Sequence, residues 1–207
     1  MDLEFLGNKS YGGWMTNVEG LTKDSIVYSC GVGFDISWDL EIIKRFGCRV
    51  YAFDPTDTSK TWLENQDTPE QFSFTQTGVA TFNGMQTFFL PLREGKADYS
   101  TVKKSGRSIR FPVKKLQTFM QERAHSHIDI LKLDIEGSEF SVLPQIASLP
   151  IKQILVEMHP NMYESGWKGL RKLLGNIKMR YAMFSLARNG FICMHRNVND
   201  YTFVKSQ

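Results

Sequence analysis

Cysteine is scarce in this sequence, and the three that occur, Cys30, Cys48 and Cys193, form no CxxC pair. Their odd number and wide spacing argue against a disulfide framework or a zinc site and favour a reducing compartment. No apolar run approaches the roughly 18 residues that span a bilayer, and the acidic N-terminus does not resemble a signal peptide. We therefore expect a cytoplasmic chain without a membrane segment, which stands alone or forms one domain of a larger protein.

An excess of one charge is also lacking, because 25 Lys and Arg against 22 Asp and Glu leave a net charge of only +3. A protein that tracks phosphates usually carries a stronger positive charge, so a nucleic-acid partner is not expected. The small basic cluster at residues 103–110 is better explained as a solvated loop than as an RNA-binding surface. A length of 207 residues fits one domain, 1–207, in which we take residues 1–24 as an N-terminal cap or substrate segment.

The hydrophobic pattern predicts alternating strands and helices. We predict strands at 26–29, 49–53, 72–80, 153–158 and in "IDILKL", and helices at 35–46, 58–65, 112–123, 138–149 and 170–177. Asn83-Gly84 predicts a tight hairpin, Pro112 suits a first helical turn, and the tail from Tyr181 resembles three strands. The alternation implies an α/β fold with a mostly parallel sheet flanked by helices, and the helix-free tail implies an antiparallel C-terminal hairpin.

The segment "VYSCGVGFDISW", residues 27–38, has the form of a cofactor loop between a strand and a helix. Gly31 and Gly33 allow a tight turn and a close approach of backbone to ligand. Asp54 ends the next strand about 20 residues later, where an acid binds ribose hydroxyls. A dinucleotide loop needs a third glycine where this chain has Ile36, which disfavours NAD. Plain turn glycines and an Asx-turn at Asp54 are the alternatives; together, loop and acid favour a nucleoside cofactor without phosphates, such as S-adenosylmethionine.

Three stretches make the pattern specific: "VYSCGVGFDISWDLEIIKRFGCRVYAFDPT", "IDILKLDIEGSEFSVL" and "QILVEMH". They resemble the FkbM-type class I methyltransferases, close to the methyltransferase-like branch that includes the METTL24 group. "SYGGW" near the N-terminus is similar to a short glycine-tryptophan stretch in those proteins. The resemblance covers roughly residues 10–205 and implies a Rossmann-like sheet of seven strands with S-adenosylmethionine as cofactor.

The resemblance also implies which residues contact that cofactor. These are Gly31, Gly33, Asp35, Asp54, Gly78, Val79 and Asp134. The loop glycines would pack against the methionine part, and Asp35 would reach its ammonium group. Asp54 would bind the ribose. The residues that end the third strand would lie near the adenine, and Asp134 would face the methyl group.

Three ionisable residues follow neighbouring strands and are the candidate catalytic groups: Asp134, Glu157 and His159. His159 suits a general base because its reference pKa of about 6.5 lies near working pH; a loop histidine before a proline is the alternative. Asp134 and Glu157 could chelate one Mg²⁺ ion, but two carboxylates are not a ligand set, so a metal is not favoured. Glu136 and Glu139 are expected to be solvated or to stabilise a helix N-terminus.

The expected function is O-methylation of a hydroxyl on a small-molecule or carbohydrate (sugar or glycan) acceptor. Two alternatives stay open: an RNA methyltransferase, and a non-catalytic domain that binds S-adenosylmethionine. Aromatic residues in polar surroundings could stack on a sugar ring or simply anchor loops. They are Tyr11, Trp14, Tyr99, Tyr163 and Trp167.

Overall fold

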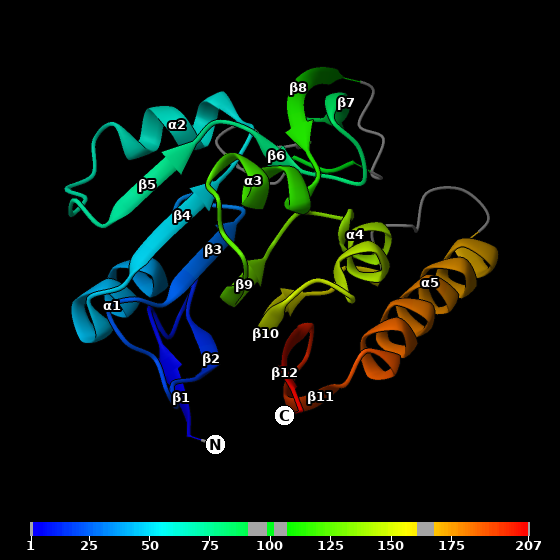
Figure 1. Cartoon of the computed structure of the whole chain (residues 1–207). Coiled ribbons are helices and arrows are strands. Elements are labelled where there is room, and N and C mark those ends of the chain that lie inside the picture. Colours follow the sequence, from blue (N-terminus) through cyan, green and yellow to red (C-terminus); the bar gives the residue numbers. More distant parts are fainter. Residues whose placement is uncertain (1, 91–98, 102–106, 161–167, 207) are drawn as a thin grey trace.

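A seven-stranded sheet forms the centre of the computed structural model, which describes residues 2–90, 99–101, 107–160 and 168–206 (Figure 1). In chain order the elements are β1 (Leu3–Leu6), β2 (Trp14–Asn17), β3 (Ile26–Cys30), α1 (Ser37–Phe46), β4 (Arg49–Phe53), α2 (Asp57–Leu63), β5 (Phe72–Thr75), β6 (Gly78–Val79), β7 (Gly84–Phe89), β8 (Ser108–Lys114), α3 (Leu116–Glu122), β9 (Ile128–Leu133), α4 (Glu139–Ile146), β10 (Ile151–Glu157), α5 (Lys168–Arg188), β11 (Phe191–Asn197) and β12 (Asp200–Lys205).

The strand order of the main sheet is β11-β12-β10-β9-β3-β4-β5. The strands from β10 through β5 pair in parallel, and β12 runs antiparallel to both β10 and β11. The order turns back between β3 and β9, because β4 and β5 lie on one side of β3 while β9 and β10 lie on the other. The predicted parallel sheet with an antiparallel C-terminal hairpin is confirmed, and the place where the order reverses is where such sheets bind ligands.

The two faces of the sheet are covered by different elements, because neighbouring residues of a strand point to opposite sides. Tyr28 and Leu131 belong to a core cluster shared with α3, α4 and α5. Their neighbours Val27 and Ile130 belong to a second cluster, shared with α1 and the β1–β2 hairpin. Figure 1 shows α4 and α5 side by side on their face. Because helices or the hairpin cover both faces of the sheet, β9 is buried along its whole length.

The N-terminal segment folds as an antiparallel hairpin of β1 and β2 against α1 and the sheet. Trp38 of α1 is fully buried and donates from Nε1 to Thr16 Oγ1 at 2.9 Å. Asn17 on β2 donates from its backbone N–H to the side chain of Gln153 on β10. The hairpin is therefore fixed to both α1 and the sheet through β2.

The third predicted strand, 72–80, is divided between two sheets. β5 belongs to the main sheet, and β6 pairs in parallel with β8 in a separate sheet of order β6-β8-β7. The hairpin prediction at Asn83-Gly84 is wrong, since β6 and β7 are not neighbours. Asn83 Oδ1 instead accepts hydrogen bonds from Lys115 N at 2.9 Å and Thr118 Oγ1 at 3.1 Å, so it satisfies donors at the start of α3.

The predicted helix at 112–123 is too long at its start. Pro112 lies in β8 opposite Met85 of β7, and α3 begins only at Leu116. Phe111 and Val113 are buried while Pro112 is exposed, which is the period of two that a strand requires. A proline is compatible with a helix start, but the alternation around this one favours a strand.

The tail prediction is wrong over residues 181–188, which continue α5 instead of forming a strand. Ala182 and Leu186 are fully buried at helical spacing, and Met179 and Met183 pack beside them. Burial on α4 thus outweighs the strand preference of the tyrosine and phenylalanine in this segment. No helix among the residues described here is both long and apolar enough to cross a membrane.

Candidate active site

A cavity of about 360 Å³ opens at the carboxyl edge of the parallel strands. Glu157 ends β10, and Asp134, Gly31 and Asp54 come directly after β9, β3 and β4. Because the sheet order is β10-β9-β3-β4, these four residues follow one another along that edge and line the same cavity. Residues 8–14 of the N-terminal hairpin line it as well.

Gly31 is held where the cofactor loop meets the loop after β9. Its φ is +90°, and a Cβ atom there would overlap the carbonyl oxygen of Asp134. Gly31 N donates to Phe53 O at 2.9 Å, and Asp134 N donates to Cys30 O at 2.8 Å, so the three strands fix this approach. Glycine is required at this position, whereas nothing crowds Gly33 more closely than the Tyr11 hydroxyl at 3.6 Å.

Asp54 is buried and organises two loops. Its Oδ2 accepts from Val32 N at 2.9 Å and from Gly33 N at 3.4 Å. Its Oδ1 accepts from the backbone N–H and the hydroxyl of Thr56, at 2.9 and 2.7 Å. The Asx-turn at Asp54 is confirmed for one oxygen. The other oxygen supports the glycine loop, and binding of a ribose by Asp54 stays a prediction.

Asp35 lines the cavity and also starts helix α1. Its Oδ1 accepts from the backbone N–H of Ser37 at 2.8 Å, while the side chain of Ile36 caps nothing. A Cβ atom on Gly12 would overlap the Asp35 carboxylate, so the N-terminal hairpin lies directly against it. Asp35 therefore connects the helix, the cavity and the hairpin.

Gly78 and Val79 form β6 and line the cavity, as do Phe53, Pro55 and Phe88. A Cβ on Gly78 would lie 3.1 Å from Pro55 Cγ and 3.3 Å from Val113 Cγ1, so little space remains there. The surroundings are apolar, as an adenine ring requires.

A buried ion pair lies beneath the glycine loop, and the sequence did not identify Asp39 as the carboxylate partner of Lys132. Lys132 Nζ lies 4.0 Å from Asp39 Oδ2 and 3.4 Å from both Ser29 Oγ and Gly31 O. Lys132 and Asp39 are almost completely buried. Burial raises the pKa of the Asp39 carboxyl, and the Lys132 ammonium opposes that shift. The sequence signal for the pair is a lysine inside a strand that is apolar apart from Lys132 and Asp129.

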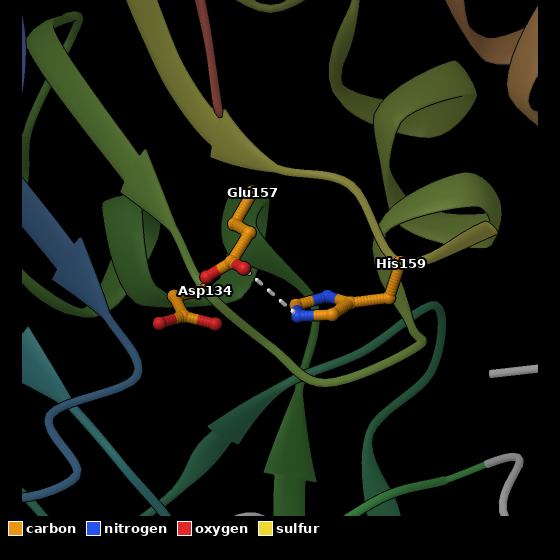
Figure 2. Close-up of side chains that lie close together, drawn as sticks. All are labelled: Asp134, Glu157 and His159. Carbon is orange, nitrogen blue, oxygen red and sulfur yellow. Dashed lines mark ion pairs between the residues drawn. The ribbon is translucent and has the colours of Figure 1, made fainter. Parts of the chain in front are cut away.

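Asp134 and Glu157 bring two carboxylates to the cavity (Figure 2). Asp134 Oδ1 is buried and has no hydrogen-bond partner among the described residues. Burial, with the neighbouring Glu157 carboxylate, raises the pKa of Asp134 to about 7.

Asp200 faces Glu157 across the β10–β12 pairing and also lines the cavity. Burial and the Glu157 carboxylate raise the pKa of Asp200 to about 6. No sequence signal identified Asp200, because an antiparallel pairing brings it here.

His159 stands among carboxylates. Its Nδ1 lies 2.9 Å from Glu139 Oε1, and its Nε2 lies 3.3 Å from Glu157 Oε1 and 3.8 Å from Glu136 Oε2. Burial opposes its charge, but the hydrogen bonds to Glu139 and Glu157 raise the pKa of His159 to about 11. The surrounding carboxylates thus favour the protonated imidazole, which would have to release its proton before Nε2 could act as a base or bind a metal ion.

Of the two expectations for Glu139, a place at a helix N-terminus is confirmed and a solvated charge is wrong. Glu139 does begin α4, but it is fully buried. Its two oxygens accept from Gly137 N at 2.9 and 3.1 Å, and one of them also binds His159. Glu139 therefore holds the histidine in place.

Of the aromatic candidates, Tyr11, Trp14 and Tyr99 line the cavity. Tyr11 is more than half exposed and Trp14 is buried. Tyr99 reaches Thr58 Oγ1 with its hydroxyl at 3.1 Å. Tyr163 and Trp167 lie outside the described residues, as do residues 103–106 of the basic cluster at 103–110.

A family model described as the methyltransferase FkbM domain matches residues 29–193, which is most of the chain. The chain belongs to the FkbM methyltransferase family. The match covers the glycine loop, Asp54 and the acids that follow β9 and β10. Membership in the FkbM family confirms the class I methyltransferase fold and, with it, S-adenosylmethionine as the cofactor. The match does not separate branches within the family, so the likeness to the METTL24 group stays an expectation.

Several solved structures are similar to this FkbM-family chain at low sequence identity. The fibrillarin pre-rRNA processing protein of Methanococcus jannaschii is 12% identical, with a TM-score of 0.49 over 91% of this chain and 68% of that one. The cyclopropane synthase MmaA2 of Mycobacterium tuberculosis is 11% identical, with a TM-score of 0.43 over 86% and 58%. Human N-acetylserotonin methyltransferase, solved with S-adenosylmethionine, is 15% identical, with a TM-score of 0.41 over 88% and 48%.

The chain thus spans between 48% and 68% of the length of these three structures. A search of the curated proteins found no match.

Proposed function

We propose that this protein is an S-adenosylmethionine-dependent O-methyltransferase that acts on a hydroxyl of a small-molecule or carbohydrate acceptor. One observation carries the proposal. A single cavity is lined by the glycine loop and Asp54 on one side and by Asp134 and Glu157 on the other. A donor bound at the first group and an acceptor bound at the second would lie next to each other, as methyl transfer requires.

The donor side follows from the loop geometry. The positive φ of Gly31 and Gly33 lets their backbone border the cavity directly, where the methionine part would lie. Asp54 already uses both oxygens for the loops, and its bond to Gly33 N is the longest at 3.4 Å. We infer that this longest bond is the one exchanged for a ribose hydroxyl, while Gly78 and Val79 border the adenine.

The acceptor side follows from the acids. The acceptor oxygen attacks the methyl carbon, the bond from methyl to sulfur breaks, and the electron pair stays on sulfur as S-adenosylhomocysteine forms. The hydroxyl proton leaves to a carboxylate at this end of the cavity. Asp134 and Glu157 are the catalytic residues we propose to contact the hydroxyl, and His159 is a positioning residue that holds Glu157.

An assay of methyl transfer tests this function. Protein incubated with radiolabelled S-adenosylmethionine and separate pools of glycans, small hydroxylated molecules and RNA should label a glycan or small-molecule pool. Base-stable label on an oxygen of a purified product supports O-methylation. Label confined to RNA would instead support the RNA alternative, and cofactor binding without transfer to any pool would support the non-catalytic alternative.

Replacing Asp54 with alanine is expected to weaken S-adenosylhomocysteine binding about 10- to 100-fold, because hydrogen bonds to a charged group contribute about 1.5–3 kcal/mol each. The change removes both the support of the glycine loop and the ribose contact. Isothermal titration calorimetry measures it. Asp57→Ala is a matched control on the same segment, because Asp57 contacts Gln76 and does not line the cavity. An Asp54→Ala dissociation constant equal to that of the control would contradict the assignment.

A cytoplasmic location remains part of the proposal. Cys30, Cys48 and Cys193 are free thiols, as is usual in a reducing compartment.

A further inference from the structure

Three potential metal ligands converge beside the cavity. Asp134, Glu157 and His159 each offer one ligand atom, and these atoms lie within 4.8 Å of one another. Figure 2 shows the two carboxylates and the imidazole turned toward a common space, with Nε2 of His159 as the nearer ring nitrogen. The sequence supplied two carboxylates, which are not a ligand set by themselves; the fold adds the third ligand.

The contact on the far side of the His159 ring is the one that metal-bound histidines make. Its Nδ1 faces Glu139 Oε1 at 2.9 Å, and Glu139 is itself fully buried and bound to Gly137 N. A metal-ligating histidine almost always donates its other ring N–H to a carboxylate or carbonyl, which fixes the ring and makes the free nitrogen a better ligand. Nε2 is thereby directed at the carboxylates.

A buried oxygen without a partner points to the same place. Asp134 Oδ1 is inaccessible to solvent and accepts no hydrogen bond from the described residues. A buried charged group left unpaired is costly, and Glu157 adds a second negative charge beside it. A cation bound between them would compensate both.

We propose that Asp134, Glu157 and His159 bind one divalent metal ion through two carboxylate oxygens and Nε2. The imidazole ligand favours a first-row transition ion over Mg²⁺, and Mn²⁺ is the one among these ions that also suits carboxylate ligands. Asp134 and Glu157 line the cavity, whereas His159 does not, so the remaining coordination positions face the cavity. If the proposed function holds, the acceptor hydroxyl would occupy one of them, which would lower its pKa.

Binding of Mn²⁺ to EDTA-treated, dialysed protein tests the metal site without cofactor or acceptor. Electron paramagnetic resonance of free Mn²⁺ during a titration should give one ion per chain, and the bound ion should show coupling to an imidazole nitrogen. Glu157→Gln should weaken Mn²⁺ binding at least about 10-fold, since loss of even a residue that only supports a ligand costs about 10- to 100-fold. In His159→Gln the nitrogen coupling should vanish.

Asp200→Asn is the matched control, because Asp200 lines the same acidic end but is not one of the three ligands. Its affinity for Mn²⁺ should stay within a few-fold of the parent protein. Equal losses of Mn²⁺ affinity in Glu157→Gln and Asp200→Asn would show that the ion is attracted by the acidic residues in general and not by the three ligands. That result would overturn the proposal. Absence of binding at millimolar Mn²⁺, or bound Mn²⁺ without nitrogen coupling, would overturn it too. Methyl transfer that persists in EDTA would refute a role of the ion but leave the proposed function standing.

A separate surface of the molecule carries a second inference. Helix α5 buries Ala182 and Leu186 against the core, yet its opposite face is apolar as well. Exposed large apolar side chains recur there at helical spacing: Leu173, Leu174, Ile177, Tyr181 and Phe184. The helix contains several lysines and arginines and no acidic residue. An apolar stripe on a basic helix is typical of an element that lies in the interface of an anionic membrane.

We propose that this face of α5, the stripe from Leu173 to Phe184, docks on an anionic lipid surface. The positive charge of the helix complements acidic headgroups, while the stripe supplies apolar area for shallow insertion. The helix is not a spanning segment, since no described helix can cross a membrane.

Sedimentation with vesicles tests the docking face. The protein should bind phosphatidylserine-containing vesicles and not pure phosphatidylcholine vesicles, and added salt should weaken binding. Phe184→Glu should lose most of the bound fraction. Val198→Glu, at an apolar residue exposed away from α5, should not. Absence of binding to either vesicle would overturn the proposal, as would a soluble dimer that Phe184→Glu dissociates, because the stripe would then face a second copy.

Discussion

Replacing Gly31 with alanine is expected to abolish S-adenosylhomocysteine binding at any concentration below about 100 times the parent dissociation constant, a loss of at least about 2.7 kcal/mol. The methyl group would enter the space of the Asp134 carbonyl oxygen, and the φ of +90° is strained for alanine. Relief requires β3 and β9 to move apart at their carboxyl ends, where Asp134 N donates to Cys30 O. Loop geometry and the position of Asp134 would change together.

Gly20→Ala is the control for the backbone contribution alone. Gly20 has a φ of +76°, the methyl group of an alanine there would meet no atom within 4 Å, and the residue does not line the cavity. The variant should lose about 1 kcal/mol of unfolding free energy from its conformation without a change in cofactor affinity. Calorimetric titration of Gly31→Ala and Gly20→Ala with S-adenosylhomocysteine measures the two dissociation constants. Comparable dissociation constants would mean that the contact between the two loops is not needed for binding.

Replacing Lys132 with methionine is expected to lower the unfolding free energy by about 3–5 kcal/mol, because the buried carboxylate of Asp39 would be left without its charged partner. Asp39 would lose its ammonium partner at 4.0 Å, and its Oδ1 already has no hydrogen-bond partner among the described residues. Because the pKa of Asp39 is raised in the folded state, the folded variant binds more protons than the unfolded chain. The loss should therefore grow as the pH rises.

The double variant Lys132→Met, Asp39→Asn separates charge from packing. It should recover at least about half of the lost stability, since no buried charge remains, and its stability should depend less on pH. Thermal unfolding followed by circular dichroism at several pH values measures both effects. If Lys132→Met is as stable as the parent protein, the ion pair of Lys132 and Asp39 does not contribute to the stability of the fold.

The sequence allowed prediction of those parts of the site that are local in the chain. Gly31 and Gly33 follow a strand, and Asp54 follows the next one, so spacing alone placed them on the same cavity. The seven-stranded sheet followed from the alternation of helices and strands and from the family resemblance. Period-two burial in β8 was present in the sequence too, but Pro112 gave a competing helix signal.

What escaped prediction depends on contacts between distant segments. Asp39 on α1 pairs with Lys132 on β9, which lies far away in the sequence. Asp200 reaches the acids only through the β10–β12 pairing. The ring of His159 is held by Glu139, which was expected to be solvated or to lie at a helix N-terminus, and not to be buried beside an imidazole. A charge pattern read along the chain cannot show which carboxylates will surround one imidazole.

The N-terminal hairpin has a consequence for how relatives diverge. Residues 8–14 border the cavity, and Gly12 lies directly against Asp35, yet the family match begins only at residue 29. Part of the cavity wall thus belongs to a segment that precedes the residues matched by the family model. We expect that exchange of this segment changes the acceptor and leaves the donor loop unchanged. A chimera that carries the hairpin of another member on residues 29–193 would keep donor affinity and change acceptor preference.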